Sequence, residues 1–196
     1  MNMLNELIEA LTCLPGVGPK SAQRMVFHLL ERARDNGLHL ASLLTQALTH
    51  IKHCEWCRTF TEFDRCLLCQ DTRRDPSIVC IVENPVDVFA IEQIHAHRGT
   101  YFVLMGHLSP IDGIGPDELG IPLLLKRFQE NQLRHIILAT SATVEGETTA
   151  HYIATLAKKY GIHLSRIAYG IPVGGELNMI DSSTLAHAFS SRTQYE

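Results

Sequence analysis

Four of the six cysteines lie within sixteen residues and have the spacing of metal ligands. Cys54 and Cys57 form one C-x2-C pair, and after eight intervening residues Cys66 and Cys69 form a second. Each pair can place two sulfurs on one side of a tight turn, and two such turns supply four thiolates. Because four thiolates close a tetrahedral shell, the pattern predicts one structural Zn²⁺ per chain, with no open position for water or substrate.

Other interpretations of the cysteines stay open at this point. The four residues can be unrelated, or contain a redox C-x2-C pair, or hold an iron–sulfur cluster. Cys13 and Cys80 stand alone in apolar segments, and we expect both to be small buried hydrophobes. If zinc binds, its binding energy is partly folding energy, so Cys57→Ser is expected to lose the metal and destabilise the N-terminal half.

A glycine-containing turn near the N-terminus is the candidate DNA contact. The segment LPGVGPKSAQR separates two apolar-striped stretches, so we expect a helix over 4–13 and another that begins near Ser21. Gly16 and Gly18 would let backbone amides approach a phosphate, and Lys20 and Arg24 share a face at the start of the second helix. This arrangement predicts a sequence-independent contact with the DNA backbone, although a simple turn between helices explains the same residues. A Walker A loop is excluded because Pro19 precedes Lys20 and no strand precedes the turn.

Acidic side chains follow two of the expected strands. Glu83 and Asp87 come after the apolar run 77–82, and Glu145 and Glu147 come after the run 135–139. The carboxyl ends of parallel strands meet at one edge, so we expect Glu83, Glu145 and Glu147 to cluster in loops there. Such a cluster can hold Mg²⁺ or dock a basic protein surface, while ordinary exposed acids remain the simpler alternative.

The remaining periodicity predicts an α/β protein built from several modules. Strands alternating with helices from residue 77 onward imply a parallel sheet with right-handed crossovers. We expect further helices over 40–52, 85–95, 121–131, 148–160 and 182–190, and strands over 77–82, 101–105 and 135–139.

Charge and hydropathy limit the class of protein. The chain has a net charge of −4, but residues 1–74 carry nine Lys/Arg against eight Asp/Glu, whereas residues 75–196 carry eight against thirteen. The N-terminal third is therefore the part suited to a polyanion, and the acidic remainder suits a basic partner, although the asymmetry is modest and a solvated mixed surface also explains it. Neither a membrane-spanning run nor a signal peptide is evident, so a cytoplasmic, nucleoid-associated location is expected.

Taken in order, the motifs resemble the bacterial recombination mediator family RecR. The resemblance rests on LPGVGPKSAQR, the four cysteines, CIVENPVD, YFVLMGHLSPIDGIGPDELG, ATSATVEGETTA and GIPVGGELNMID, and spans roughly residues 7–190. It implies a helix-hairpin-helix region over 1–53, a zinc finger over 54–76, a Toprim domain over 77–167 and a C-terminal oligomerisation segment with a Walker B-like strand over 168–196. It also implies a homotetrameric ring large enough to encircle DNA.

The same resemblance implies partners and roles. Family members act with RecO to load RecA onto single strands coated by SSB, and with RecF at gaps and single-to-double-strand junctions. Lys20 and Arg24 match the DNA-contacting positions, while Glu83, Asp87, Glu145 and Glu147 match Toprim positions that face RecO or a metal. Ser141-Ala142 stands where we expect Asn-Pro.

The residue types favour a binding protein over an enzyme. Catalytic Toprim enzymes carry Asp-x-Asp where this chain has Glu145-Gly146-Glu147. Two alternatives to the non-catalytic mediator nevertheless remain. One is a metal-dependent Toprim nuclease or primase-like enzyme that uses Glu83, Glu145 and Glu147 on Mg²⁺. The other is a zinc-stabilised scaffold that contacts only protein.

Overall fold

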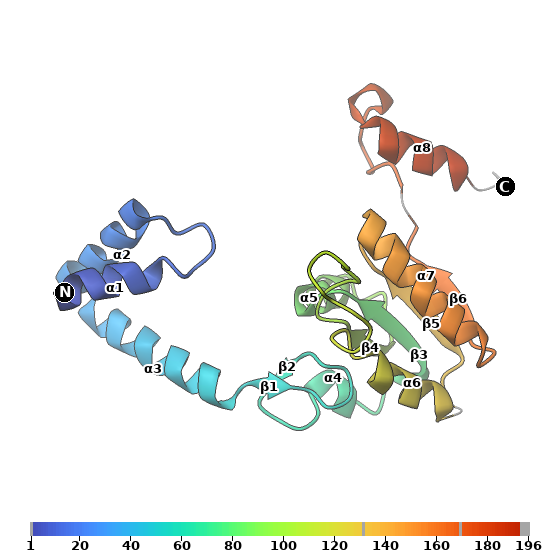
Figure 1. Ribbon diagram of the computed structural model, residues 1–196, viewed down its shortest axis with the longest axis horizontal. Helices are drawn as coiled ribbons and strands as arrows, with labels where there is room; N and C mark the ends of the chain where they lie inside the picture. The colour runs from blue at the N-terminus through green and yellow to red at the C-terminus, as the bar shows by residue number, and fades with distance from the viewer. Residues whose placement is uncertain (1, 131, 169, 193–196) are drawn as a thin grey trace. The chain divides into compact units, whose positions relative to one another are not determined.

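The computed structural model describes residues 2–130, 132–168 and 170–192 (Figure 1). The chain divides into two compact units, Met1–Ile51 and Lys52–Glu196. None of the described helices is long and apolar enough to cross a bilayer.

The first unit consists of three helices. They are α1 (Met3–Leu11), α2 (Pro19–Arg32) and α3 (Arg34–His50). Helix α2 packs against both of its neighbours and buries Ala22 and Val26. The first two helices were predicted from their apolar stripes, but the third begins six residues earlier than expected. Residues 34–39 (RDNGLH) resemble a loop in composition, yet packing against α2 outweighs their low helix propensity.

The second unit is built on a four-stranded parallel sheet. Its strands are β3 (Asp75–Val82), β4 (Gly99–Val103), β5 (His135–Ala139) and β6 (His163–Arg166), in the order β4-β3-β5-β6. The crossovers are formed by α5 (Pro85–Gln93), α6 (Ile121–Gln129) and α7 (Val144–Lys158). The predicted α/β fold with a parallel sheet is therefore confirmed.

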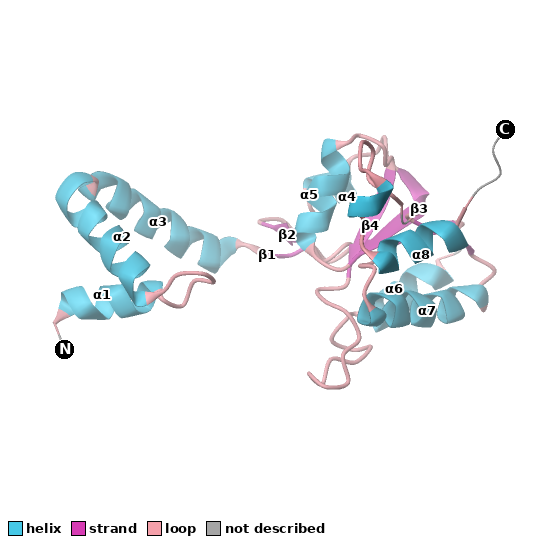
Figure 2. Cartoon of the chain, turned by 90° about the horizontal axis from the view of Figure 1, so that it is seen from above, coloured by secondary structure: helices cyan, strands magenta, loops and turns pink. Residues whose placement is uncertain are grey.

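Helices lie on both faces of this sheet (Figure 2), and each face has its own apolar core. On one face, Val79, Ile81 and Phe102 pack against α6 and α7. On the other face, Cys80, Val82 and Tyr101 pack against α5 and against the cysteine segment. Successive strand residues point to opposite faces, which is why odd- and even-numbered β3 residues separate in this way. The cysteine segment is thus part of the core of the sheet.

Two shorter regions flank the sheet in sequence. The cysteine segment contains a small antiparallel pair, β1 (Lys52–His53) and β2 (Phe60–Thr61), followed by α4 (Leu67–Gln70). After β6, the described residues form the 3-10 turn η1 (Leu177–Met179) and α8 (Ser182–Ser190). Helix α8 has the predicted bounds, but the described part of 168–192 contains no Walker B-like strand. Residues 169 and 193–196 of that expected segment, and residue 131 at the expected end of α6, lie outside the described residues.

Candidate functional sites

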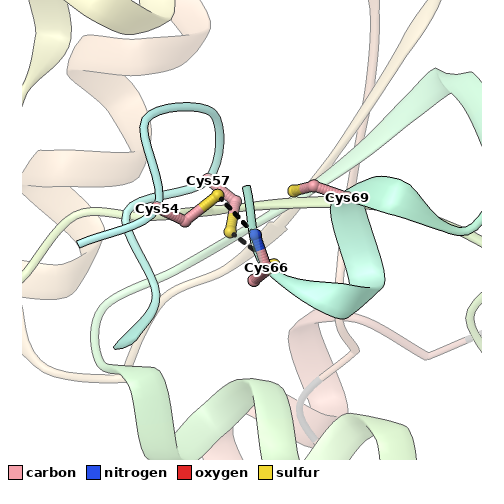
Figure 3. Close-up of side chains that lie close together, drawn as sticks. All are labelled: Cys54, Cys57, Cys66 and Cys69. Atoms are coloured by element: carbon pink, nitrogen blue, oxygen red, sulfur yellow. Dashed lines mark hydrogen bonds between the residues drawn. The ribbon is translucent and has the colours of Figure 1, made fainter. Parts of the chain in front are cut away.

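The four cysteines converge on one point (Figure 3). The sulfurs of Cys54, Cys57, Cys66 and Cys69 all lie within 4.8 Å of one another, and the Cys57 and Cys66 sulfurs are 3.5 Å apart. A disulfide would require about 2.05 Å. Four sulfurs at about 2.3 Å from a tetrahedral zinc ion lie roughly 3.8 Å apart, so the cluster has dimensions that fit Zn²⁺.

Backbone hydrogen bonds build both cysteine turns. The Cys54 amide donates to the Thr59 carbonyl (2.8 Å), and the Arg58 amide donates to the Cys54 carbonyl (2.9 Å). Arg58 has φ +67°, which lets the chain turn back after Cys57. The Cys66 amide donates to the Cys54 sulfur at 3.3 Å, as expected where an amide stabilises a thiolate. The two turns therefore face each other as a preformed ligand set.

The cysteine segment also covers the open edge of the sheet. Strand β4 is an edge strand, and its Val103 amide donates to the Cys57 carbonyl at 2.8 Å. The Arg58 guanidinium donates to the carbonyls of Leu104 (3.0 Å), Leu119 and Glu118 (2.9 Å). Gly120 has φ +69°, and a Cβ there would collide with this guanidinium. An exposed edge strand is a pairing hazard, and here the first cysteine turn is hydrogen-bonded to it.

Sequence reasoning missed two residues beside the cluster, Trp56 and Arg127. Arg127 lies on α6, is 4% exposed and sits 4.9 Å from the Trp56 ring. Arg127 lies on the same buried face of the helix as Ile121, Leu124 and Phe128. Their helical spacing was a usable signal, but a charged residue next to Lys126 is normally interpreted as solvated.

The two remaining cysteines differ from each other. Cys80 is buried as expected, and burial raises the pKa of its thiol to about 12. Cys13 is exposed, so the expectation of a buried residue was wrong for it. It lies in the turn after α1, where the chain leaves the helical packing.

The glycine turn presents both cations to solvent. Gly16 has φ +77°, a conformation that glycine adopts without strain. Gly18 is the N-cap of α2 and provides no side-chain cap, and Pro19 follows at the first helical position. Lys20 and Arg24 are exposed, and their side chains form no hydrogen bond or ion pair with the described residues. The start of α2 therefore carries uncapped amides beside two free cations.

Glu83 lies at the carboxyl end of β3 but is not an open ligand. It is 4% exposed, and its two oxygens accept from the Ser141 amide (2.9 Å) and the Ser141 hydroxyl (2.6 Å). The His107 Nδ1 lies 3.9 Å away. Ser141, which replaces an expected asparagine, thus joins the end of β3 to the turn before α7.

The other acids occupy helix starts. Glu145 and Glu147 were expected in a loop, but α7 begins at Val144, because the Thr143 hydroxyl caps the amide of Gly146 (3.1 Å). Glu145 is exposed, and Glu147 pairs with Arg166 on β6. Asp87 accepts from the Asn84 amide (2.8 Å) in the capping box of α5.

The expected three-carboxylate cluster is not formed. Among the described residues, the four cysteines are the one group of three or more metal-binding side chains whose ligand atoms converge within 4.8 Å. Glu83 does lie near Glu145 and Glu147, because Gly146 between these two residues approaches the Glu83 side chain. A Cβ added to Gly146 would be 2.9 Å from the Glu83 carboxylate. However, the Glu83 carboxylate binds Ser141 and the Glu147 carboxylate pairs with Arg166, whereas Glu145 is exposed.

Three family profiles match the chain. Residues 4–48 match the profile described as RecR, helix-hairpin-helix, and residues 170–193 match the one described as RecR, C-terminal. Residues 77–168 match the Toprim domain. The cysteine segment lies between the first match and the Toprim match, so the order of the modules agrees with the order of the motifs.

Proposed function

Because the chain belongs to the RecR family, we propose that it is a non-catalytic, ring-forming clamp in recombinational DNA repair. The RecR domains support a recombination mediator role and imply DNA binding and oligomerisation. In this proposal the modules are 1–53, 54–76, 77–167 and 168–196, and a tetramer encloses DNA. Several linked copies of a weak contact would raise the overall affinity through effective concentration.

The observation that carries the DNA-binding proposal is the exposed start of α2. Its first-turn amides have no side-chain cap, and Lys20 and Arg24 have no partner among the described residues. Helix N-termini attract anions, and two neighbouring cations add charge without reading bases. Gly16, Gly18, Lys20 and Arg24 would therefore hold a phosphate backbone in a sequence-independent manner.

The test is the double variant Lys20→Glu/Arg24→Glu in gapped-DNA binding over a range of salt concentrations. We expect weaker binding, and the slope of log affinity against log salt should become shallower by about 0.9 for each phosphate that the variant no longer neutralises. Hydrodynamic size should not change, because both side chains are exposed.

A charge-matched control is Lys158→Glu/Lys159→Glu at the end of α7, where both lysines are exposed. It makes the same change in net charge on the other unit. Full DNA affinity in the Lys20/Arg24 variant, or an equal loss in the control, would reject the role of the hairpin.

We further propose that the carboxyl edge of the sheet docks RecO, with RecF as the second partner at gaps and junctions. Glu145 is the exposed acid there and suits a direct contact with a basic surface. Glu83, Asp87 and Glu147 would act mainly by fixing the edge, since each already binds another part of the chain. Glu145→Gln should weaken RecO binding without lowering DNA affinity, and unchanged RecO binding would remove this surface from the proposal.

The cysteine cluster supports a structural Zn²⁺ as the resident metal, one per chain. Its four sulfurs have the number, type and spacing of a closed zinc shell. Elemental analysis of purified protein should give about one zinc per chain. By contrast, no described group of carboxylates supports an Mg²⁺ site. The nuclease or primase-like alternative is not supported by Glu83 either, since its carboxylate is hydrogen-bonded to Ser141.

A further inference from the structure

Arg127 is a buried cation without a carboxylate partner. It is 4% exposed, and no described Asp or Glu forms an ion pair with it. Its guanidinium donates to two neutral acceptors, the Tyr101 carbonyl (2.9 Å) and the Thr100 hydroxyl (2.8 Å). A buried charge without an opposite charge is costly, and these neutral acceptors compensate only part of that cost.

The first cysteine turn lies against this guanidinium. Arg127 stacks at 4.9 Å on Trp56, which lies between Cys54 and Cys57 in the first ligand turn. Burial lowers the pKa of Arg127, and the sulfurs of Cys69 and Cys57 oppose that shift. Glu130 contributes less than either sulfur. Thiolates at Cys69 and Cys57 therefore favour the charged form of this guanidinium.

A nearby cation would stabilise the negative charge of a cluster that has bound zinc. Four thiolates around one Zn²⁺ leave two excess negative charges, held here among buried side chains. Groups around a metal centre that are not ligands commonly set its stability through charge and hydrogen bonding. Arg127 lies on α6, 58 residues beyond Cys69, and contacts the first cysteine turn through Trp56.

We propose that Arg127 is a positioning residue for the metal centre: its buried charge offsets that of the zinc-loaded thiolates and couples metal loading to the edge of the Toprim sheet. This inference rests on the zinc site proposed above. The coupling is direct because the same guanidinium holds the Tyr101 carbonyl of β4, while the Cys57 carbonyl holds the Val103 amide of that strand. The residues that surround the proposed metal site therefore also hold the edge strand of the sheet.

The test measures zinc affinity by competition with a chromogenic chelator in the full chain. Arg127→Met keeps the length and apolar body of the side chain but removes the charge, and we expect zinc affinity to fall by about 10- to 100-fold. Arg127→Lys keeps the charge and should fall much less. If Arg127→Met does not fold, the zinc affinity of Arg127→Gln is compared with that of Arg127→Lys instead.

Arg65→Met is the matched control. Arg65 lies at the same 4.9 Å from Trp56 but is exposed, so solvent already screens its charge, and its loss should leave zinc affinity nearly unchanged. Wild-type affinity in Arg127→Met, equal loss in Arg127→Lys, or equal loss in Arg65→Met would overturn the role of Arg127. Wild-type protein that binds no zinc would instead refute the underlying metal site.

Discussion

At the scale of single residues, we expect the contact between Ser141 and Glu83 to contribute to the stability of the fold. Glu83 is buried, and Ser141 supplies hydrogen bonds to both of its oxygens. Ser141→Ala removes the hydroxyl donor and leaves a buried carboxylate oxygen without it. We expect the free energy of unfolding to fall by roughly 1–3 kcal/mol, measured by urea denaturation.

The control for this prediction is Thr148→Ala. Thr148 is an exposed α7 residue whose hydroxyl donates to a carbonyl of its own helix at 2.7 Å, so its removal should change stability little. If Ser141→Ala is no more destabilising than Thr148→Ala, Glu83 does not depend on the serine.

The convergence of the four cysteines was predictable from their spacing. Two C-x2-C pairs restrict the positions of four sulfurs through local turns, so the members of the cluster could be named from the sequence. Arg127 could not, because its role depends on a cluster 58 residues away in the chain and on an edge carbonyl. The hydrogen bond from Ser141 to Glu83 could not be predicted either, because it joins residues at the ends of two different strands.

At the scale of elements, Asp87 has a structural role in the capping box of α5 and a proposed role in binding RecO, and two variants distinguish them. Its carboxylate caps the Asn84 amide, and Asp87→Ala should lower the free energy of unfolding by about 1 kcal/mol. Asp87→Asn keeps an acceptor oxygen while it removes the charge, so it should retain most of the stability. Urea denaturation of both variants measures the cap.

The same pair of variants also tests the proposed docking role. If the charge of Asp87 contacts RecO, Asp87→Asn should weaken the complex in a binding titration although the protein remains stable. A normal complex in Asp87→Asn would leave Asp87 with the capping role alone.

Element prediction succeeded for apolar strands and failed for a polar one. Strand β5 (HIILA) is enclosed by β3 and β6, and its apolar composition correctly predicted a strand. Strand β6 (HLSR) escaped detection because it is a short edge strand with few apolar residues. The start of α7 was placed four residues late, since its signal is the Thr143 cap rather than an apolar stripe.

At the scale of the whole molecule, the position of the cysteine cluster changes the expected effect of metal loss. Sequence order suggested that Cys57→Ser would destabilise the N-terminal half. The cluster instead belongs to the core on one face of the Toprim sheet, and the first unit ends at Ile51. Metal loss should therefore weaken the second unit, while the three helices of the first unit keep their own packing.

Hydrogen exchange with and without a zinc chelator tests this directly. After chelation we expect faster exchange in β4 and around Cys80 near the end of β3, because Cys57 and Arg127 hold the edge strand and the cysteines pack with Cys80 and Tyr101. Amides of α2, around the buried Ala22 and Val26, should be unaffected. The same pattern is expected in Cys57→Ser. Faster exchange confined to α1–α3, with a protected β4, would show that the metal stabilises the helical unit and not the sheet.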